Sequence, residues 1–185
     1  MTIGTRTMSR RMDTILANLQ SQSSADWKVR SGELRAIVDL LGQGAALSDS
    51  FLPLVSLLRE PLRQQLCDLR STIVADACHA VSALARHLAA PHLEPLAAHL
   101  LPQLLQRTSV KIKAMSQPAD ECIEILVAAC CRSSAGLNRC CAILCEDVGS
   151  GPHRNASAHR RAIGLRYLES ALRIPWAGGG GAGGG

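Results

Sequence analysis

Aromatic residues are scarce in this sequence of 185 residues: Phe, Tyr and Trp together make up only 2% of it. Strands are enriched in aromatic and β-branched residues, so this scarcity argues against a sheet. Leu and Ala instead dominate the apolar 47% of the chain, and both favour helices that pack on helices. We therefore predict an all-α fold, and the length is sufficient for one domain with a real core.

The sequence also lacks long hydrophobic runs. No stretch reaches the roughly 18 consecutive apolar residues of a membrane-spanning helix, and residues 1–6 contain no apolar core of a signal peptide. We therefore expect a soluble protein of the cytoplasm with no membrane partner. The formal net charge of +5 makes the surface mildly attractive to acidic partners, a class that includes acidic proteins and nucleic acid.

Signatures of catalysis are missing as well. The sequence contains no Gly-rich phosphate loop followed by Lys-Ser/Thr, no nucleophile elbow, and no paired His with a carboxylate on one helical face. Its six His residues are scattered, with no acidic or thiol partner at the spacing of metal ligands. We therefore expect a protein that is not an enzyme, with no catalytic residues and no cofactor.

The eight Cys residues do not form a zinc-binding pattern. Such a pattern needs closely spaced pairs that are matched by a second pair or by His. The adjacent pairs Cys130-Cys131 and Cys140-Cys141 point to different sides of a helix, and only Cys141 and Cys145 share a face. We expect reduced Cys residues that act as small core or surface residues, and no metal site.

Apolar residues recur at steps of three and four along most of the chain, which predicts amphipathic helices. Prolines interrupt this pattern at several positions, and inside a helix a proline removes a hydrogen bond and bends or breaks the helix. The expected helices cover residues 8–19, 27–41, 52–66 with an interruption near Pro61, 71–88, 91–105 with bends or breaks at Pro95 and Pro102, 111–130 with a kink at Pro118, 137–148 and 158–172.

Several polar residues and glycines are expected to mark helix ends. Ser71 or Asp68 provides a side-chain oxygen that can accept from the free N–H groups of the helix that begins near residue 71. Thr108-Ser109 is expected to cap the sixth helix in the same way. Gly42 and Gly44 are expected to end the second helix.

Polar turns precede the expected inner helices at Trp27, Ser71, Ser109 and Asn155. Their interval of roughly 40 to 45 residues is typical of HEAT and armadillo arrays. The sequence therefore predicts an α-solenoid of about four helix pairs. In such a solenoid the turns of successive repeats align along one edge and form a surface for a partner.

Four segments together resemble a known family, the TOG domains of the CLASP N-terminal type. Asp26-Trp27-Lys28-Val29-Arg30, before a Leu-rich helix, resembles the first TOG turn, and Asp68-Leu69-Arg70-Ser71 resembles the second. Thr108-Ser109-Val110-Lys111-Ile112 resembles the third turn, and Asn155 through Arg160-Arg161, ahead of Tyr167-Leu168, resembles the fourth.

The resemblance suggests a domain organisation. It covers residues 8–174, which we expect to form the TOG-like array. Residues 1–7 are expected to be a flexible N-terminus, and the Gly-rich residues 175–185 a disordered tail. TOG domains usually continue for more repeats, so an array of about four helix pairs is expected to be incomplete at its C-terminal end.

Members of this family bind tubulin through the edge formed by the turns and regulate microtubules. The resemblance implies that Trp27 is the apolar anchor on tubulin and that Lys28, Arg70, Lys111 and Arg161 are its basic contacts. It implies αβ-tubulin or microtubules as partners, together with other microtubule plus-end or ciliary proteins. It places the protein on the microtubule cytoskeleton, with the spindle and the cilium among the candidate locations.

Two other classes of function stay open at this point. A general HEAT or armadillo scaffold would bind a peptide or a partner helix in its groove, and Trp27 would then be a buried residue that packs on the neighbouring repeat. Nucleic-acid binding is disfavoured, because the basic residues are interleaved with Asp and Glu and almost no aromatics are present to stack on bases.

Overall fold

The computed structural model describes residues 5–21, 23–149, 162, 164–167, 169–170 and 173, and all statements below concern these residues. The described chain is helical and contains no strand, so the predicted all-α class is confirmed. None of the described helices combines the length and the hydrophobicity that crossing a bilayer requires.

The described helices follow one another with short connections. The α-helices are α1 (Thr5–Leu19), α2 (Trp27–Gly42), α3 (Leu52–Val55), α4 (Arg59–Leu66), α5 (Ser71–His87), α6 (Ala90–Thr108), α7 (Lys113–Cys130) and α8 (Ser134–Gly149). Three short 3₁₀ turns lie between them: η1 (Ser24–Asp26), η2 (Ala45–Leu47) and η3 (Ser56–Leu58).

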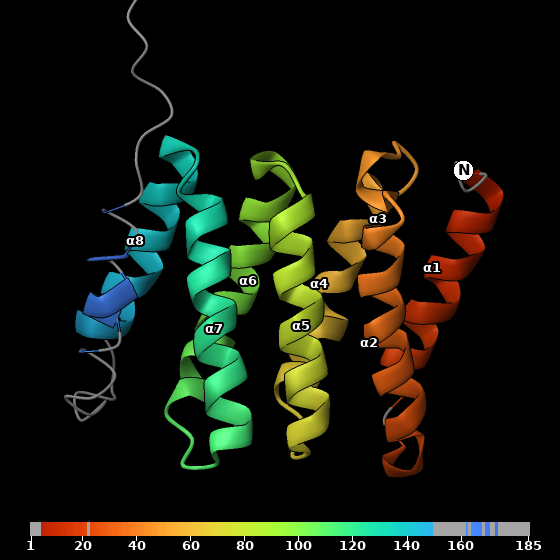
Figure 1. Ribbon diagram of the computed structural model, residues 1–185, viewed down its shortest axis with the longest axis horizontal. Coiled ribbons are helices and arrows are strands. Elements are labelled where there is room, and N and C mark those ends of the chain that lie inside the picture. Colours follow the sequence, from red (N-terminus) through yellow and green to blue (C-terminus); the bar gives the residue numbers. More distant parts are fainter. Residues whose placement is uncertain are drawn as a thin grey trace, which may run out of the picture.

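These helices form two layers. Helices α2, α5 and α7 lie side by side in one layer, and α1, α4, α6 and α8 lie behind them in the other (Figure 1). Each inner helix is preceded by an outer helix, so the chain repeats an outer-to-inner step along the long axis of the molecule. This stacking of helix pairs confirms the predicted α-solenoid.

Helix α5 lies at the centre of the array, between α2 and α7, with α4 also packed against it. Most of its residues are buried, and many of them are small, including Ala77, Ala80, Val81 and Ala85. Small side chains let neighbouring helices approach closely and fill the space with few voids. The apolar stripe predicted for this segment is thus buried against three neighbouring helices.

The caps differ from the expectation. Arg70, not Ser71, is the N-cap residue of α5, and no side chain caps that helix. Asp68 does accept a backbone N–H, but it is that of Arg70 (2.8 Å), one residue before the helix. Thr108 is the last residue of α6, and its hydroxyl donates to the carbonyl of Leu105 (2.8 Å). Its predicted role as a cap of the next helix was therefore wrong.

The prolines do not break the helices that contain them, so of the predicted bends and breaks the breaks do not occur. Pro95 and Pro102 lie inside the continuous helix α6, and Pro118 lies inside α7, so these helices are not divided into pieces. The third expected helix is interrupted at η3, before Pro61. Pro61 itself lies in the first turn of α4, where a backbone N–H has no partner within the helix and its loss costs little.

Gly44 and Gly32 provide a matched test of the backbone. Gly44 has φ = 86°, a conformation that costs an L-residue about 1–2 kcal/mol, so we expect Gly44→Ala to lower the free energy of unfolding by that amount. Gly32 is exposed in α2, and an added Cβ meets no atom within 4 Å. Gly32→Ala is therefore expected to raise stability by up to about 1 kcal/mol.

Urea denaturation followed by circular dichroism would measure both changes. A Gly44→Ala variant as stable as the original chain would contradict the left-handed conformation at this turn.

Candidate functional site: the edge of intra-repeat turns

Three turns between outer and inner helices lie along the same edge of the array. They comprise residues 20–21 and 23–26 with the first residues of α2 (27–29), residues 67–70 before α5 and residues 109–112 before α7, and Figure 1 shows them side by side at its lower edge. We call this surface the turn edge. The fourth predicted turn, around Asn155 to Arg161, lies outside the described residues. Helix pairs of similar length explain the alignment, because each chain reversal then falls at the same height.

The first turn holds Trp27 at the start of α2. The Ser21 hydroxyl donates to the carboxylate of Asp26 (2.7 Å), which fixes the backbone before the helix. Trp27 is half-buried and packs against the core, and the Lys28 ammonium lies 5.7 Å from the centre of its ring. Val29 is exposed beside them. Trp27 therefore both packs on the array and contributes surface to the edge.

The second turn presents an apolar side chain that the sequence reasoning overlooked. Leu69 is 90% exposed, at the tip of the turn between α4 and α5. Arg70 follows it, with one guanidinium nitrogen 3.8 Å from an Asp68 carboxylate oxygen. The only signal in the sequence was an isolated Leu within a polar turn.

Asp68 connects this second turn to the first repeat. Arg30 of α2 donates one guanidinium N–H to Asp68 and another hydrogen bond to Gln65, both at 2.9 Å. The Gln65 amide in turn donates to the backbone carbonyl of Leu19 at the end of α1 (2.8 Å). Both ionised side chains are only 9% exposed, so burial of their charges is compensated by pairing and hydrogen bonds. The turn of one repeat is thus held by the helices of the repeat before it.

A second polar link joins α2 directly to the next inner helix, α5. The Ser31 hydroxyl of α2 donates to Asp76 of α5 (2.5 Å), and Arg35 pairs with the same carboxylate (3.3 Å). Ser31 and Asp76 are both buried. Together with the Arg30 contacts, this link fixes how α2 and α5 are placed relative to each other.

A comparable link lies at the other end of the described array. Arg166 and Tyr167 both bond to the Asp120 carboxylate on α7. Burial, together with the nearby negative charge of Asp120, raises the pKa of the Tyr167 hydroxyl well above its ordinary value. Tyr167 therefore stays neutral and donates a hydrogen bond that helps to hold helical residues 164–167 on α7.

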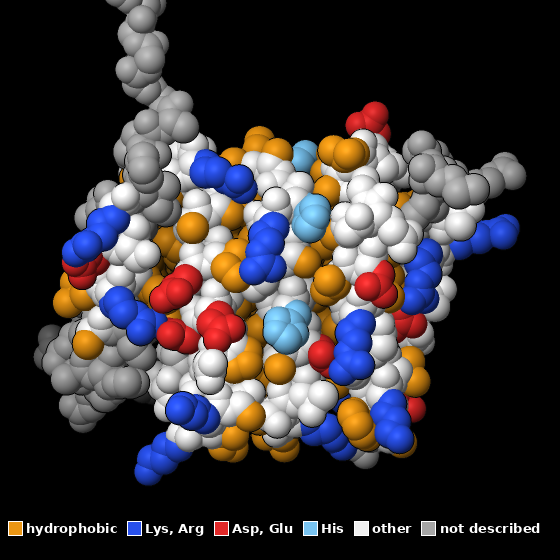
Figure 2. All heavy atoms as spheres, in the orientation of Figure 1, with side chains coloured by type: hydrophobic (Ala, Val, Ile, Leu, Met, Phe, Trp, Pro, Cys, Tyr) orange, Lys and Arg blue, Asp and Glu red, His pale blue; other side chains and the backbone are white. Residues whose placement is uncertain are grey.

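The third turn combines an apolar side chain with basic ones, as the first two turns do. Lys111 is exposed in it, Ile112 is 54% exposed, and Lys113 follows as the first residue of α7. Figure 2 shows Lys and Arg side chains beside hydrophobic ones at the lower edge, below α7 and below α2. Ile112, like Leu69, was not singled out from the sequence.

Except for Cys67, whose thiol donates to the Gln103 side-chain carbonyl (3.2 Å), the thiols and imidazoles of the described residues lie away from the turn edge. A hydrogen bond with Cys122, together with burial, raises the pKa of the Cys78 thiol, which lies within the core. The cysteines of the described residues are free thiols, most of them buried, and those residues contain no cluster of side chains suited to a metal ion. His99 does have an acidic partner, Glu60 at 3.3 Å on α4, which its position in the sequence did not reveal.

Paired helices in two layers, with aligned turns on one edge, define an α-solenoid of the HEAT or armadillo class. The family model described as CLASP N terminal matches residues 8–163. The chain therefore belongs to the CLASP N-terminal family. It is similar to a CLIP-associated protein from Arabidopsis thaliana, with 31% identity over 121 residues, which is 65% of this chain and 8% of that protein. The chain thus spans less than a tenth of the length of this relative.

Four of the five predicted contact residues lie on the turn edge. Trp27, Lys28, Arg70 and Lys111 come from three different repeats and are brought to one surface by the alignment of the turns. Arg161 lies outside the described residues. The exposed Val29, Leu69 and Ile112 add apolar surface to the same edge.

We expect Arg30→Met to be strongly destabilising. It removes the buried cation that contacts Asp68 at 2.9 Å and leaves only the more distant and more exposed Arg70 at 3.8 Å; breaking a buried pair typically costs about 3–5 kcal/mol. Arg63→Met is the matched control, because it breaks an Arg–carboxylate pair with Glu60 on the exposed surface of α4, where solvent screens the charges. Urea denaturation of both variants measures the difference. Equal, small effects of the two substitutions would contradict the buried link between the first two repeats.

Proposed function

We propose that this chain is a tubulin-binding module of a microtubule-associated regulator, that it has no enzymatic activity, and that it contacts αβ-tubulin or microtubules through the turn edge. One observation carries the proposal: at each of the three described turns, an apolar or aromatic side chain that is exposed or half-buried lies next to a basic one. These pairs are Trp27 with Lys28, Leu69 with Arg70, and Ile112 with Lys111.

This combination suits a large acidic protein partner. Apolar anchors that become buried supply most of the affinity of an interface, and aromatic residues are frequent among them. Flanking Lys and Arg side chains complement a negative surface and accelerate the encounter more than they tighten the complex. Isolated apolar side chains on a soluble surface are common, but their recurrence in consecutive turns points to one extended interface.

Membership of the CLASP N-terminal family supports this assignment, because family members are microtubule-associated. The proposed contact residues are Trp27, Lys28, Arg70, Lys111 and Arg161, within an array that extends over residues 8–174. The proposal places the chain on the microtubule cytoskeleton, where other plus-end or ciliary proteins are further candidate partners. Size-exclusion co-elution of the purified chain with unpolymerised αβ-tubulin, at low and at moderate salt, tests it directly.

Two equally exposed leucines give the sharpest test of the turn edge. Leu69 and Leu47 are each 90% exposed, but Leu47 belongs to η2, which follows the opposite end of α2. We expect Leu69→Glu to weaken the affinity for tubulin by about tenfold or more, as for an interface anchor, and so to reduce co-elution. We expect Leu47→Glu to leave the affinity unchanged. Trp27→Glu should act like Leu69→Glu at unchanged helicity. Full binding by both edge variants, or equal loss with Leu47→Glu, would refute the assigned surface.

The basic residues should act mainly on the association rate. For Lys111→Glu we expect tubulin association to slow by roughly 3-fold to 10-fold at low salt, with a smaller effect at high salt, because exposed charges steer the encounter and are screened. Arg86→Glu is the control, since Arg86 is exposed at the opposite end of α5. Stopped-flow or biolayer interferometry measurements at two salt concentrations would show this. Rates that do not depend on salt in either variant would argue against electrostatic steering by this edge.

A further inference from the structure

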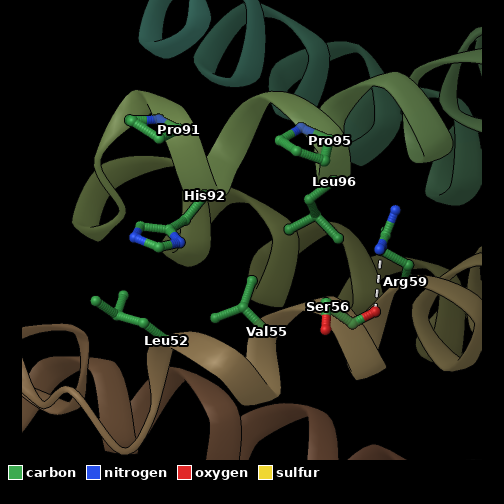
Figure 3. A pocket seen from close by; sticks show the side chains of 8 residues that line it. All are labelled: Leu52, Val55, Ser56, Arg59, Pro91, His92, Pro95 and Leu96. Atoms are coloured by element: carbon green, nitrogen blue, oxygen red, sulfur yellow. Dashed lines mark hydrogen bonds between the residues drawn. The ribbon is translucent and has the colours of Figure 1, made fainter.

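A groove separates two outer segments far from the turn edge. It lies between the stretch from α3 to the start of α4 and the first turns of α6 (Figure 3). Val55 and Leu96 form its floor and are buried, while Leu52 and the ring of Pro95 form its walls. Leu96 precedes the end of α6 by twelve residues, so the groove lies about 18 Å along the helix axis from the third turn.

The groove exists because the outer layer is interrupted at this repeat. Helix α3 has only 4 residues and is followed by the 3₁₀ turn η3, so the chain does not present a full helix face to α6. On the facing side, Pro91 and Pro95 present their rings toward the groove (Figure 3). Rigid rings opposite a short helix leave space that the core does not fill.

The groove has the size of a single side chain. Its volume of about 120 Å³ approaches that of an apolar cavity of roughly 150 Å³ that accommodates a benzene molecule. One aliphatic side chain would therefore fill it and bury the apolar floor. The groove is too small for a helix or a large cofactor.

The rim of the groove carries one permanently charged side chain, the guanidinium of Arg59. Arg59 lies at one end, where its Nε donates to the carbonyl of Ser56 (3.2 Å), and His92 lies at the rim on the α6 side (Figure 3). Among the residues that line the groove, neither those from α3 to α4 nor those of α6 include an Asp or Glu. Glu60 accepts from Arg63 and His99, and Glu94 accepts from the Ser133 hydroxyl (2.6 Å). The Arg59 guanidinium therefore has no carboxylate partner among the described residues.

We propose that this groove binds a peptide segment of a partner protein that inserts one aliphatic side chain between α3 and α6 and places a neighbouring carboxylate on Arg59. Residues 1–4, 150–161 and 174–185 of this chain contain no Asp or Glu. These segments therefore lack the side-chain carboxylate that the proposed ligand places on Arg59. The groove lies on a different part of the array from the turn edge, so this second site does not depend on the proposed tubulin contact.

The test uses the full chain with isotope-labelled methyl groups and three capped hexapeptides. The first has a central Leu flanked by Glu on both sides, the second replaces Glu by Lys, and the third replaces Leu by Ala. Titration is followed by NMR at the methyl groups of Val55 and Leu96. We expect saturable shifts with the first peptide only, since the groove selects both an aliphatic group and a negative charge.

The Arg59→Glu variant is the decisive control, because Arg59 lies on the surface and its substitution is expected to leave the fold intact. We expect the Glu-flanked peptide to bind about 5-fold to 10-fold more weakly to it, and the Lys-flanked peptide to gain affinity. Tubulin co-elution of the variant should stay unchanged, because Arg59 does not belong to the turn edge.

Three results would overturn the proposal. The first is no methyl shift at the solubility limit of the Glu-flanked peptide. The second is equal binding of the Glu-flanked and Lys-flanked peptides, which would remove the role of Arg59. The third is a concentration-dependent dimer that Leu47→Glu abolishes, which would assign the groove to the exposed Leu47 and nearby Asp49 of a second copy.

Discussion

The buried ion pair between Arg30 and Asp68 is the contact on which the turn edge depends most directly. It connects an inner helix of the first repeat to the loop that carries Leu69 and Arg70. A surface loop by itself has few apolar contacts and would sample many conformations. Because Asp68 also accepts the N–H of Arg70, the position of the second turn is set by the first repeat, and the two turns act as parts of one surface.

The same arrangement explains why polar residues are tolerated inside the array. Apolar packing holds α5 against α2 and α7, but such packing is non-directional and leaves sliding along the helix axes weakly restrained. The directional bond of Ser31 with Asp76 fixes the register of α2 against α5, and the bond of Tyr167 with Asp120 attaches helical residues 164–167 to α7. Each lies between neighbouring repeats, so the alignment of the turns is determined pair by pair.

Local sequence patterns predicted the helices well and the details of their ends poorly. Apolar periodicity and the glycines near Gly44 identify α2 correctly, because these signals depend on neighbours in the chain. The caps near Ser71 and Thr108 were wrong because the carboxylate of Asp68 and the hydroxyl of Thr108 found other partners in three dimensions. Four predicted contact residues do lie on one edge, whereas the exposure of Leu69 became visible only once the turn was folded.

The two surfaces of the array differ in the kind of partner they suit. The turn edge is long and distributes its apolar and basic residues over three repeats, which suits a large and rigid acidic surface. The groove between α3 and α6 accepts one side chain next to one charge, which suits a short flexible segment. Under the two proposals the turn edge and the groove lie on separate parts of the helical array, so one chain would bind both partners at once. A peptide held in the groove would then be delivered to the partner on the turn edge at a high effective concentration.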